Sequence, residues 1–144
     1  MLRAKPTSQE DLVSRLGAIS LLGAAASEIE SARREVLERQ REDGGWAQLP
    51  GMESDAYATG LTLFTLQRTR FPTDQPAYRR GVEFLLRTQE EDGSWHVKSR
   101  SKPIQKFFDN DDPHGPDQFI SIPATAWAST ALALSLPEPR RRRL

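Results

Sequence analysis

Apolar and charged positions divide the chain into five stretches of two kinds. Three stretches are predominantly apolar, and the two stretches between them carry apolar residues on one helical face and charged residues on the other. A helix that is apolar around its circumference is expected to be buried on all sides, whereas an amphipathic helix lies at the surface. The pattern therefore predicts an all-α chain of about five helices, alternately inner and outer: inner at about 9–26, outer at 29–41, inner at 55–69, outer at 75–89 and inner at 119–136.

The two outer stretches share the spacing of the residues on one helical face, which are apolar except for the final Gln. The positions run i, i+3, i+7, i+8 and i+11 in both: Ile29, Ala32, Val36, Leu37 and Gln40, then Tyr78, Gly81, Leu85, Leu86 and Gln89. This spacing predicts a half-buried helix in each case. Thr7 or Ser8 suits the N-cap of the first inner helix, and Pro123 suits the first turn of the last one.

A seven-residue segment at the end of each outer stretch is repeated. Gln40-Arg41-Glu42-Asp43-Gly44-Gly45-Trp46 returns as Gln89-Glu90-Glu91-Asp92-Gly93-Ser94-Trp95, an offset of 49 positions. The inner stretches that follow are offset by 66 positions, from Ala58-Thr59 to Ala124-Thr125, so the second copy holds about seventeen more residues. They fall at about 98–118, and a long loop in a compact repeat is usually functional or disordered.

The second copy and the helix before it match a known motif: Arg80-Gly81-x-x-Phe84-Leu85-x-x-x-Gln89-x-x-x-Gly93-x-Trp95. This is the Gln–Trp repeat of squalene and oxidosqualene cyclases, so the chain resembles the terpenoid-cyclase and protein-prenyltransferase superfamily over about residues 29–136. The first copy keeps its Gln, Gly and Trp but has Ser31-Ala32 and Glu35-Val36 in place of the basic–Gly and aromatic–Leu pairs. The resemblance implies a partial α/α toroid of inner and outer helices over residues 1–137, and composition adds a basic tail at 138–144.

The repeat residues are expected to hold the corners of the toroid rather than to take part in chemistry. A Gln at the end of an outer helix can stack on the Trp ring and hydrogen-bond free backbone groups. A Gly permits the tight turn, and the Trp fills the space with a large apolar ring. The structural residues predicted on this basis are Gln40, Gly44, Trp46, Gln89, Gly93 and Trp95.

An acidic string in the long loop carries the second part of the resemblance. Asp109-Asn110-Asp111-Asp112 matches the Asp-x-Asp-Asp motif with which squalene–hopene-type cyclases protonate an alkene, which implies that Asp111 donates the proton and that Asp109 and Asp112 tune it. The context differs, because the family motif runs directly into Thr-Ala at the start of an inner helix, whereas Asp112 is followed by Pro113. Two other hypotheses stay open: solvated turn residues, or a divalent-cation site that also uses Asp117.

Composition excludes several other kinds of site. The chain has no cysteine, which rules out disulfides, iron–sulfur clusters, thiol nucleophiles and the zinc site of protein prenyltransferases. Equal numbers of basic and acidic residues, 20 and 20, argue against nucleic acid as a partner. No glycine-rich phosphate loop or hydrolase elbow occurs, and His96 is expected at the surface rather than as a ligand. We therefore expect no cofactor and no metal.

The inner stretches are expected to line an apolar cavity that binds a polyisoprenoid. Aromatic faces stabilise carbocations by about 0.5–2 kcal/mol each, although ordinary core packing is the alternative for the same side chains. The predicted lining residues are Tyr57, Leu61, Phe64, Phe119 and Trp127. The leading hypothesis is a squalene- or terpene-cyclase-like repeat domain or fragment without a complete catalytic site. There are two alternatives. One is an active proton-initiated triterpene cyclase segment that uses Asp111 and would be an isomerase, and the other is a non-enzymatic helical scaffold that binds protein.

Five helices are too few to close the toroid of this superfamily. Stacked repeats leave apolar surface at an open end, so we expect the remainder of a toroid or self-association to cover Leu12–Ala26 and Phe119–Leu136. Pro123 and several hydroxyl residues interrupt the longest uncharged run, which argues against a transmembrane segment. No targeting signal is recognisable, so the default expectation is a cytoplasmic protein, at most peripheral to a membrane.

Overall fold

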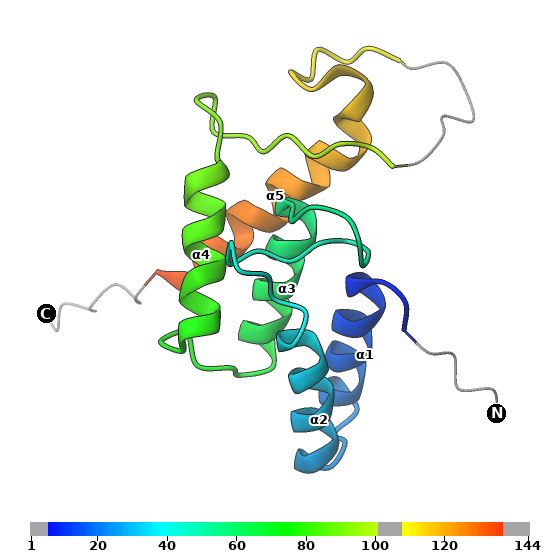
Figure 1. Ribbon diagram of the computed structural model, residues 1–144, viewed down its shortest axis with the longest axis vertical. Coiled ribbons are helices and arrows are strands. Elements are labelled where there is room, and N and C mark those ends of the chain that lie inside the picture. The colour runs from blue at the N-terminus through cyan, green and yellow to red at the C-terminus, as the bar shows by residue number, and fades with distance from the viewer. Residues whose placement is uncertain (1–5, 101–107, 137–144) are drawn as a thin grey trace, which may run out of the picture.

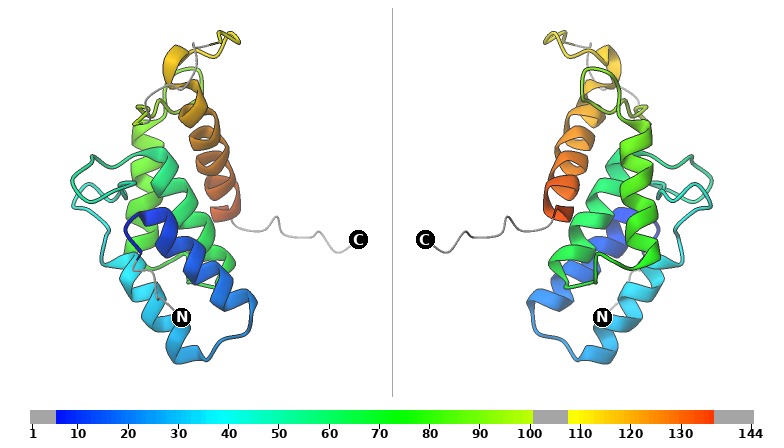
Figure 2. Two further views of the ribbon diagram at one scale, coloured as in Figure 1. Left: turned by 90° about the vertical axis from the view of Figure 1, so that its right-hand side faces the viewer. Right: turned by 90° about the vertical axis from the view of Figure 1, so that its left-hand side faces the viewer.

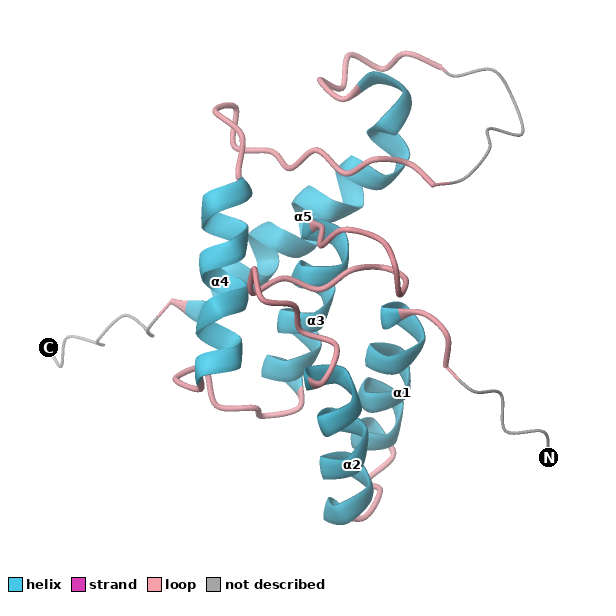
Figure 3. Ribbon diagram, viewed as in Figure 1, coloured by secondary structure: helices cyan, strands magenta, loops and turns pink. Residues whose placement is uncertain are grey.

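The computed structural model describes residues 6–100 and 108–136, and within these ranges the chain is built from α-helices (Figures 1 and 3). Five α-helices and one 3-10 turn, η1, follow one another: α1 Gln9–Leu21, α2 Ala26–Leu37, α3 Ala56–Arg68, α4 Pro76–Thr88, η1 Gly115–Asp117 and α5 Gln118–Ser135. The described residues form no strand, and extended pairing is limited to one isolated bridge between Trp46 and Asp55. The all-α prediction is confirmed.

The helices form an inner and an outer layer, and α3 is the central helix of the inner layer. The central helix α3 packs against α1 on one side and α5 on another, and these three form the inner layer (Figure 2). The outer helix α2 packs on α1, and the outer helix α4 packs on α3 and α5. Inner and outer helices therefore alternate along the chain, as predicted, in a partial α/α toroid.

The α1–α2 turn lies earlier than predicted. Ser8 caps α1 with its hydroxyl on the backbone N–H of Asp11, and the Asp11 carboxylate accepts the N–H of Ser8, which completes a capping box. The helix ends at Leu21 rather than near residue 26, because Gly23 takes a left-handed φ of 71° that stops it. The shift leaves Leu21 89 % exposed, so the expectation of all-round burial is wrong for this end of α1.

Burial distinguishes the other apolar helices. The middle of α3 is enclosed, with Leu63 and Leu66 fully buried, which confirms its prediction as an inner helix. The helix α5 is buried on one side only, and Phe119 on its opposite side is 70 % exposed. The buried part of a helix is set by the helices that pack on it, and α3 and α4 are the α-helices that pack closely against α5 in the described part of the chain. The exposed flank expected at Phe119–Leu136 is therefore present.

Two details of helix placement also differ from expectation. Leu86, which the spacing assigns to the buried face of α4, is 58 % exposed, while Phe84 is buried against Gly45 of the loop that follows α2. Pro123 lies inside α5 rather than in its first turn, because the helix already begins at Gln118. A proline there cannot donate to the carbonyl of Phe119.

A close crossing fixes α5 on α3. A Cβ atom at Gly60 would lie 2.6 Å from the backbone nitrogen of Ala128, closer than side chains approach. The absence of a side chain at this one position lets the two inner helices meet backbone to backbone. The inner layer is thereby held at a short and defined spacing.

Parts of two sequence predictions lie outside the described residues: the basic tail at 138–144 and positions 101–107 of the long loop. Of the described helices, none has the length and apolarity that crossing a bilayer requires.

Candidate functional site

The loop after α2 turns a corner that is held by Trp46. The ring is fully buried, and its indole N–H donates to the carbonyl of Val36 at 2.9 Å. The backbone N–H of Trp46 donates to the hydroxyl of Thr59 on α3 at 2.9 Å. The amide of Gln40 donates to the carbonyl of Gly44 at 2.8 Å. The corner therefore ties the end of an outer helix to the start of the next inner helix.

The loop after α4 repeats this geometry around Trp95. The buried indole N–H donates to the carbonyl of Leu85 at 2.9 Å, and the backbone N–H donates to the hydroxyl of Thr125 on α5 at 3.1 Å. Gln89 donates to the carbonyl of Gly93 at 2.9 Å. Gly44 and Gly93 take nearly equal positive φ angles of 88° and 87°. The structure thus places all six predicted corner residues in two matching arrangements.

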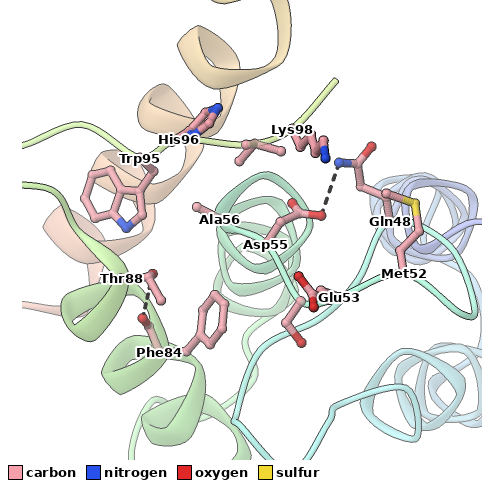
Figure 4. A pocket seen from close by; sticks show the side chains of 12 residues that line it. Gln48, Met52, Glu53, Asp55, Ala56, Phe84, Thr88, Trp95, His96 and Lys98 are labelled. Carbon is pink, nitrogen blue, oxygen red and sulfur yellow. Dashed lines mark hydrogen bonds between the residues drawn. The ribbon is translucent and has the colours of Figure 1, made fainter. Parts of the chain in front are cut away.

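A cleft of about 470 Å³ lies between the two corners (Figure 4). Phe84 and Trp95 form its apolar side, and Asp55, Gln48 and Lys98 lie on the opposite side. The complete lining is Gln48, Met52, Glu53, Ser54, Asp55, Ala56, Phe84, Thr88, Trp95, His96, Val97 and Lys98. The cleft thus combines two aromatic side chains with several polar and charged ones.

Asp55 is one of the polar residues of the cleft that sequence reasoning missed. It is the N-cap of α3: one carboxylate oxygen accepts the N–H of Ala58 at 2.8 Å and the other accepts the Gln48 amide at 3.1 Å. Burial raises the pKa of the Asp55 carboxyl above its ordinary value, although these hydrogen bonds oppose the shift. An acidic residue directly before the uncharged run of 56–67 was the available signal for a capping position.

The predicted lining residues lie on another face, along the inner helices. Phe64 on α3 and Trp127 on α5 are half-buried, and their ring centroids are 5.0 Å apart with the planes tilted by 49°. Leu61 and Tyr57 are also half-buried, one and two turns before Phe64, respectively, on the same face of α3. Tyr57 and the exposed Phe119 border a smaller cleft of about 180 Å³. The structure brings these residues near one another along the inner layer. None of them lines the 470 Å³ cleft, and Phe64 borders a separate cleft of about 550 Å³.

The acidic string forms turns within its own loop. The carboxylate of Asp109 accepts the N–H of Asp111, and the carboxylate of Asp112 accepts the N–H of His114 at 2.9 Å. Asp109 and Asp111 are exposed, and Asp111 has a positive φ of 64°. None of the three carboxylates lines the 470 Å³ cleft. Asp117 is separate from them, at the end of η1, where the N–H of Ser99 and the ring of His96 lower the pKa of its carboxyl.

Comparison with known proteins gives one result. The family model described as the squalene-hopene cyclase C-terminal domain matches residues 6–135, which is most of the chain. No curated protein matches the sequence.

Proposed function

Because the chain belongs to the squalene-hopene cyclase C-terminal domain family, we propose that it is a terpene-cyclase-like domain whose inner face binds an apolar polyisoprenoid. The observation that carries the proposal is the pair of half-buried rings, Phe64 and Trp127, which joins two inner helices. Tyr57 and Leu61 extend this face along α3. We name these four residues the inner-face patch.

The chemistry of the patch fits a hydrocarbon ligand. A polyisoprenoid has no hydrogen-bonding group along its chain, so its recognition depends on the apolar area removed from water, worth about 25 cal/mol per Å². Tilted aromatic rings also present electron-rich faces, which attract a carbocation by about 0.5–2 kcal/mol each. The same patch can therefore hold a neutral polyene and favour its cationic form.

Tryptophan fluorescence can test binding directly. Trp46 and Trp95 are fully buried, and Trp127 is the half-buried tryptophan. Squalene dispersed in a non-ionic detergent should shift the emission of the chain to shorter wavelength relative to detergent alone, because the ligand excludes water from the Trp127 ring. Trp127→Phe should abolish the shift. Phe64→Ala should weaken calorimetric binding by about tenfold, the equivalent of 1.4 kcal/mol.

Leu22→Ala is the control, because Leu22 is an apolar side chain that is 83 % exposed, lies in the α1–α2 turn and is not part of the patch. An emission shift that persists in Trp127→Phe, or equal weakening by Phe64→Ala and Leu22→Ala, would show that squalene does not use the inner face.

We further propose that the chain alone lacks a complete proton-initiated cyclisation site. Asp111, the candidate donor, is exposed and lies in a turn, whereas the cleft carboxyl with a raised pKa belongs to Asp55. Incubation of the purified chain with squalene should therefore yield no cyclised hydrocarbon by gas chromatography. A cyclised product that disappears in Asp111→Asn would establish the alternative, an active isomerase segment.

The exposed side of α5 also bears on how the domain is used. Phe119 and Ile122 are exposed one turn apart on a helix without charged residues, so we propose that a remaining part of a toroid or a second copy covers this side. Sedimentation of the chain should show concentration-dependent association that Phe119→Lys abolishes. A stable monomer would favour the scaffold hypothesis, in which another protein occupies this side.

A further inference from the structure

Both histidines of the chain meet at the second corner. His96 follows Trp95, and His114 lies just before η1, yet their ring centroids are 5.0 Å apart and the ring planes are parallel to within 2°. The carboxylate of Glu90 joins them, and one ligand atom of each of the three residues lies within 4.8 Å of the others. We propose that Glu90, His96 and His114 bind a divalent transition metal ion, Zn²⁺ in the first instance.

The hydrogen bonds of the two rings leave a suitable nitrogen free on each. His96 Nε2 lies 2.8 Å from the Asp117 carboxylate, which can only accept, so the proton is on Nε2. Ser94 Oγ donates to the Asp92 carboxylate at 2.6 Å and is thereby left to accept from His114 Nε2 at 2.8 Å. Nδ1 of both rings therefore carries a lone pair.

This arrangement is typical of metal-binding histidines. In such sites the second ring nitrogen donates to a carboxylate or another acceptor, which fixes the tautomer and makes the ligating nitrogen more basic. Asp117 has this position behind His96, and the Asp92–Ser94 pair has it behind His114. The three residues of the proposed site are thus supported by polar groups that already hold the rings.

Metal binding requires a small rearrangement. Ligand atoms around a tetrahedral ion with bonds of about 2.0–2.1 Å lie roughly 3.4 Å apart, closer than the present 4.8 Å limit. Two parallel rings cannot both direct a lone pair at one ion, so one ring must turn. His96 has room to turn, because 46 % of its side chain is exposed, and Glu90 is exposed as well.

The ligand set favours zinc over the harder cations. Two imidazole nitrogens and one carboxylate suit Zn²⁺ and related transition metals, whereas Mg²⁺ and Ca²⁺ prefer oxygen ligands. Three protein ligands also leave a fourth position for water or a substrate group. His96 also lines the 470 Å³ cleft, so an ion held there would lie at its edge.

The first corner shows that these ligands are not part of the repeat itself. Arg41 and Ala47 occupy the positions that correspond to Glu90 and His96, and the third ligand, His114, lies in the connection that is longer in the second copy. A metal ion would therefore tie the second corner to the far end of that connection and close it into a loop. The sequence alone predicts His96 as a surface residue; the nearness of His114 is what the structure adds.

The test uses the untagged full chain, freed of metal by chelation, and ZnCl₂ titrated against a chromophoric chelator. We expect one equivalent of Zn²⁺ to bind with a dissociation constant in the micromolar range or below, in the presence of a hundredfold excess of Mg²⁺. His96→Gln and His114→Gln should each weaken binding at least tenfold, and Asp117→Asn should weaken it by about 10–100-fold. Circular dichroism checks that each variant keeps its helices.

Glu91→Gln is the matched control for Glu90→Gln, because it removes the same charge from the neighbouring exposed residue. Weakening by Glu90→Gln with unchanged binding in Glu91→Gln supports the site. Absence of Zn²⁺ binding, or binding that survives both histidine substitutions, overturns it, and the latter result would direct attention to the Asp109–Asp112 turn. Equal weakening by the two glutamate substitutions would show attraction to surface charge and overturn it as well.

Discussion

The two corners have the same tryptophan geometry but differ in what lies beyond it. At the first corner, Gln40 also donates to the carbonyl of Ala77 at 2.7 Å and accepts from Arg80 at 2.5 Å, so the next outer helix locks the turn. At the second corner, the described residues give Gln89 only its bond to Gly93. There the space around the turn is occupied by Ser94 and the two histidines.

The comparison separates two functions of one sequence motif. The bonds of the Trp and the turn Gly are local, since they form whether or not another outer helix follows. The second set of Gln bonds is an interface between successive repeats. A corner without that interface keeps its shape and has a surface available for other chemistry. Substitutions at paired positions can test this distinction.

Replacing the buried tryptophans should have the largest effect. Trp46→Ala and Trp95→Ala each remove a fully buried ring and its indole hydrogen bond, so each should lower the free energy of unfolding by about 3–5 kcal/mol. Urea denaturation followed by circular dichroism measures both. The half-buried Trp127 is the control, with an expected loss of about 2 kcal/mol for Trp127→Ala. If Trp95→Ala lowered the free energy of unfolding by less than the control Trp127→Ala does, the second corner would not be equivalent to the first.

Substitution of the turn glycines should destabilise the chain by different amounts at the two corners. Both have a positive φ, which costs any other residue about 1–2 kcal/mol. A Cβ at position 44 would also meet the carbonyl oxygen of Arg80 at 2.5 Å, whereas a Cβ at position 93 meets no atom closer than 3.9 Å. Gly44→Ala should therefore cost about 3–4 kcal/mol and Gly93→Ala only about 1 kcal/mol. Equal losses in thermal or urea unfolding would contradict the packing of α4 on the first corner.

Substitution of the corner glutamines should also cost more stability at the first corner than at the second. The difference should be smaller than for the glycines. Among the described residues, the side chain of Gln40 makes three hydrogen bonds and that of Gln89 makes one, at about 0.5–1.5 kcal/mol for each bond. We expect Gln40→Ala to cost about 2 kcal/mol and Gln89→Ala about 0.5 kcal/mol. Arg80→Ala is the control, because it removes one bond of Gln40 and leaves the other two. A Gln89→Ala loss as large as that of Gln40→Ala would show that the second corner has an interface of its own.

The smallest expected effect concerns pH. Asp55 begins α3 beside the first corner, and Ser121 is its uncharged counterpart beside the second. Because burial raises the pKa of Asp55 above 3.8, the folded chain holds this proton more tightly than the unfolded chain does. The stability of the wild type relative to Asp55→Asn should therefore fall as the pH rises from about 4 to 7. Urea unfolding at several pH values measures the difference, and Ser121→Ala should leave the slope unchanged.

Sequence reasoning could predict the helices and the corners because both depend on local spacing. The five helices follow from apolar periodicity, and the pairing of Gln with Gly and Trp recurs within seven residues. The end of α1 was also readable, since Gly23 follows Leu22 directly, but the long apolar run concealed it. Local signals were sufficient wherever a residue's role depends on its near neighbours in the chain.

The remaining features depend on distant parts of the chain. The exposure of Phe119 depends on which helices cover α5, and an apolar sequence does not say how many neighbours it has. The cleft arises where the residues around Asp55 meet the segment after Trp95. The stacked histidines are 18 positions apart in the sequence, and no periodicity of the chain predicts that they meet. Proximity of this kind requires coordinates.

The pairing of each Trp backbone with a threonine hydroxyl has a practical consequence. The two partners are 13 residues apart in the first copy and 30 in the second, yet the bond is nearly the same length. The same Trp–Thr hydrogen bond therefore forms with connections of different length between its two partners. The connection between each Trp and its Thr partner is therefore a position where a peptide epitope or a sensor loop can be inserted by design. Natural sequences can vary in length at the same position.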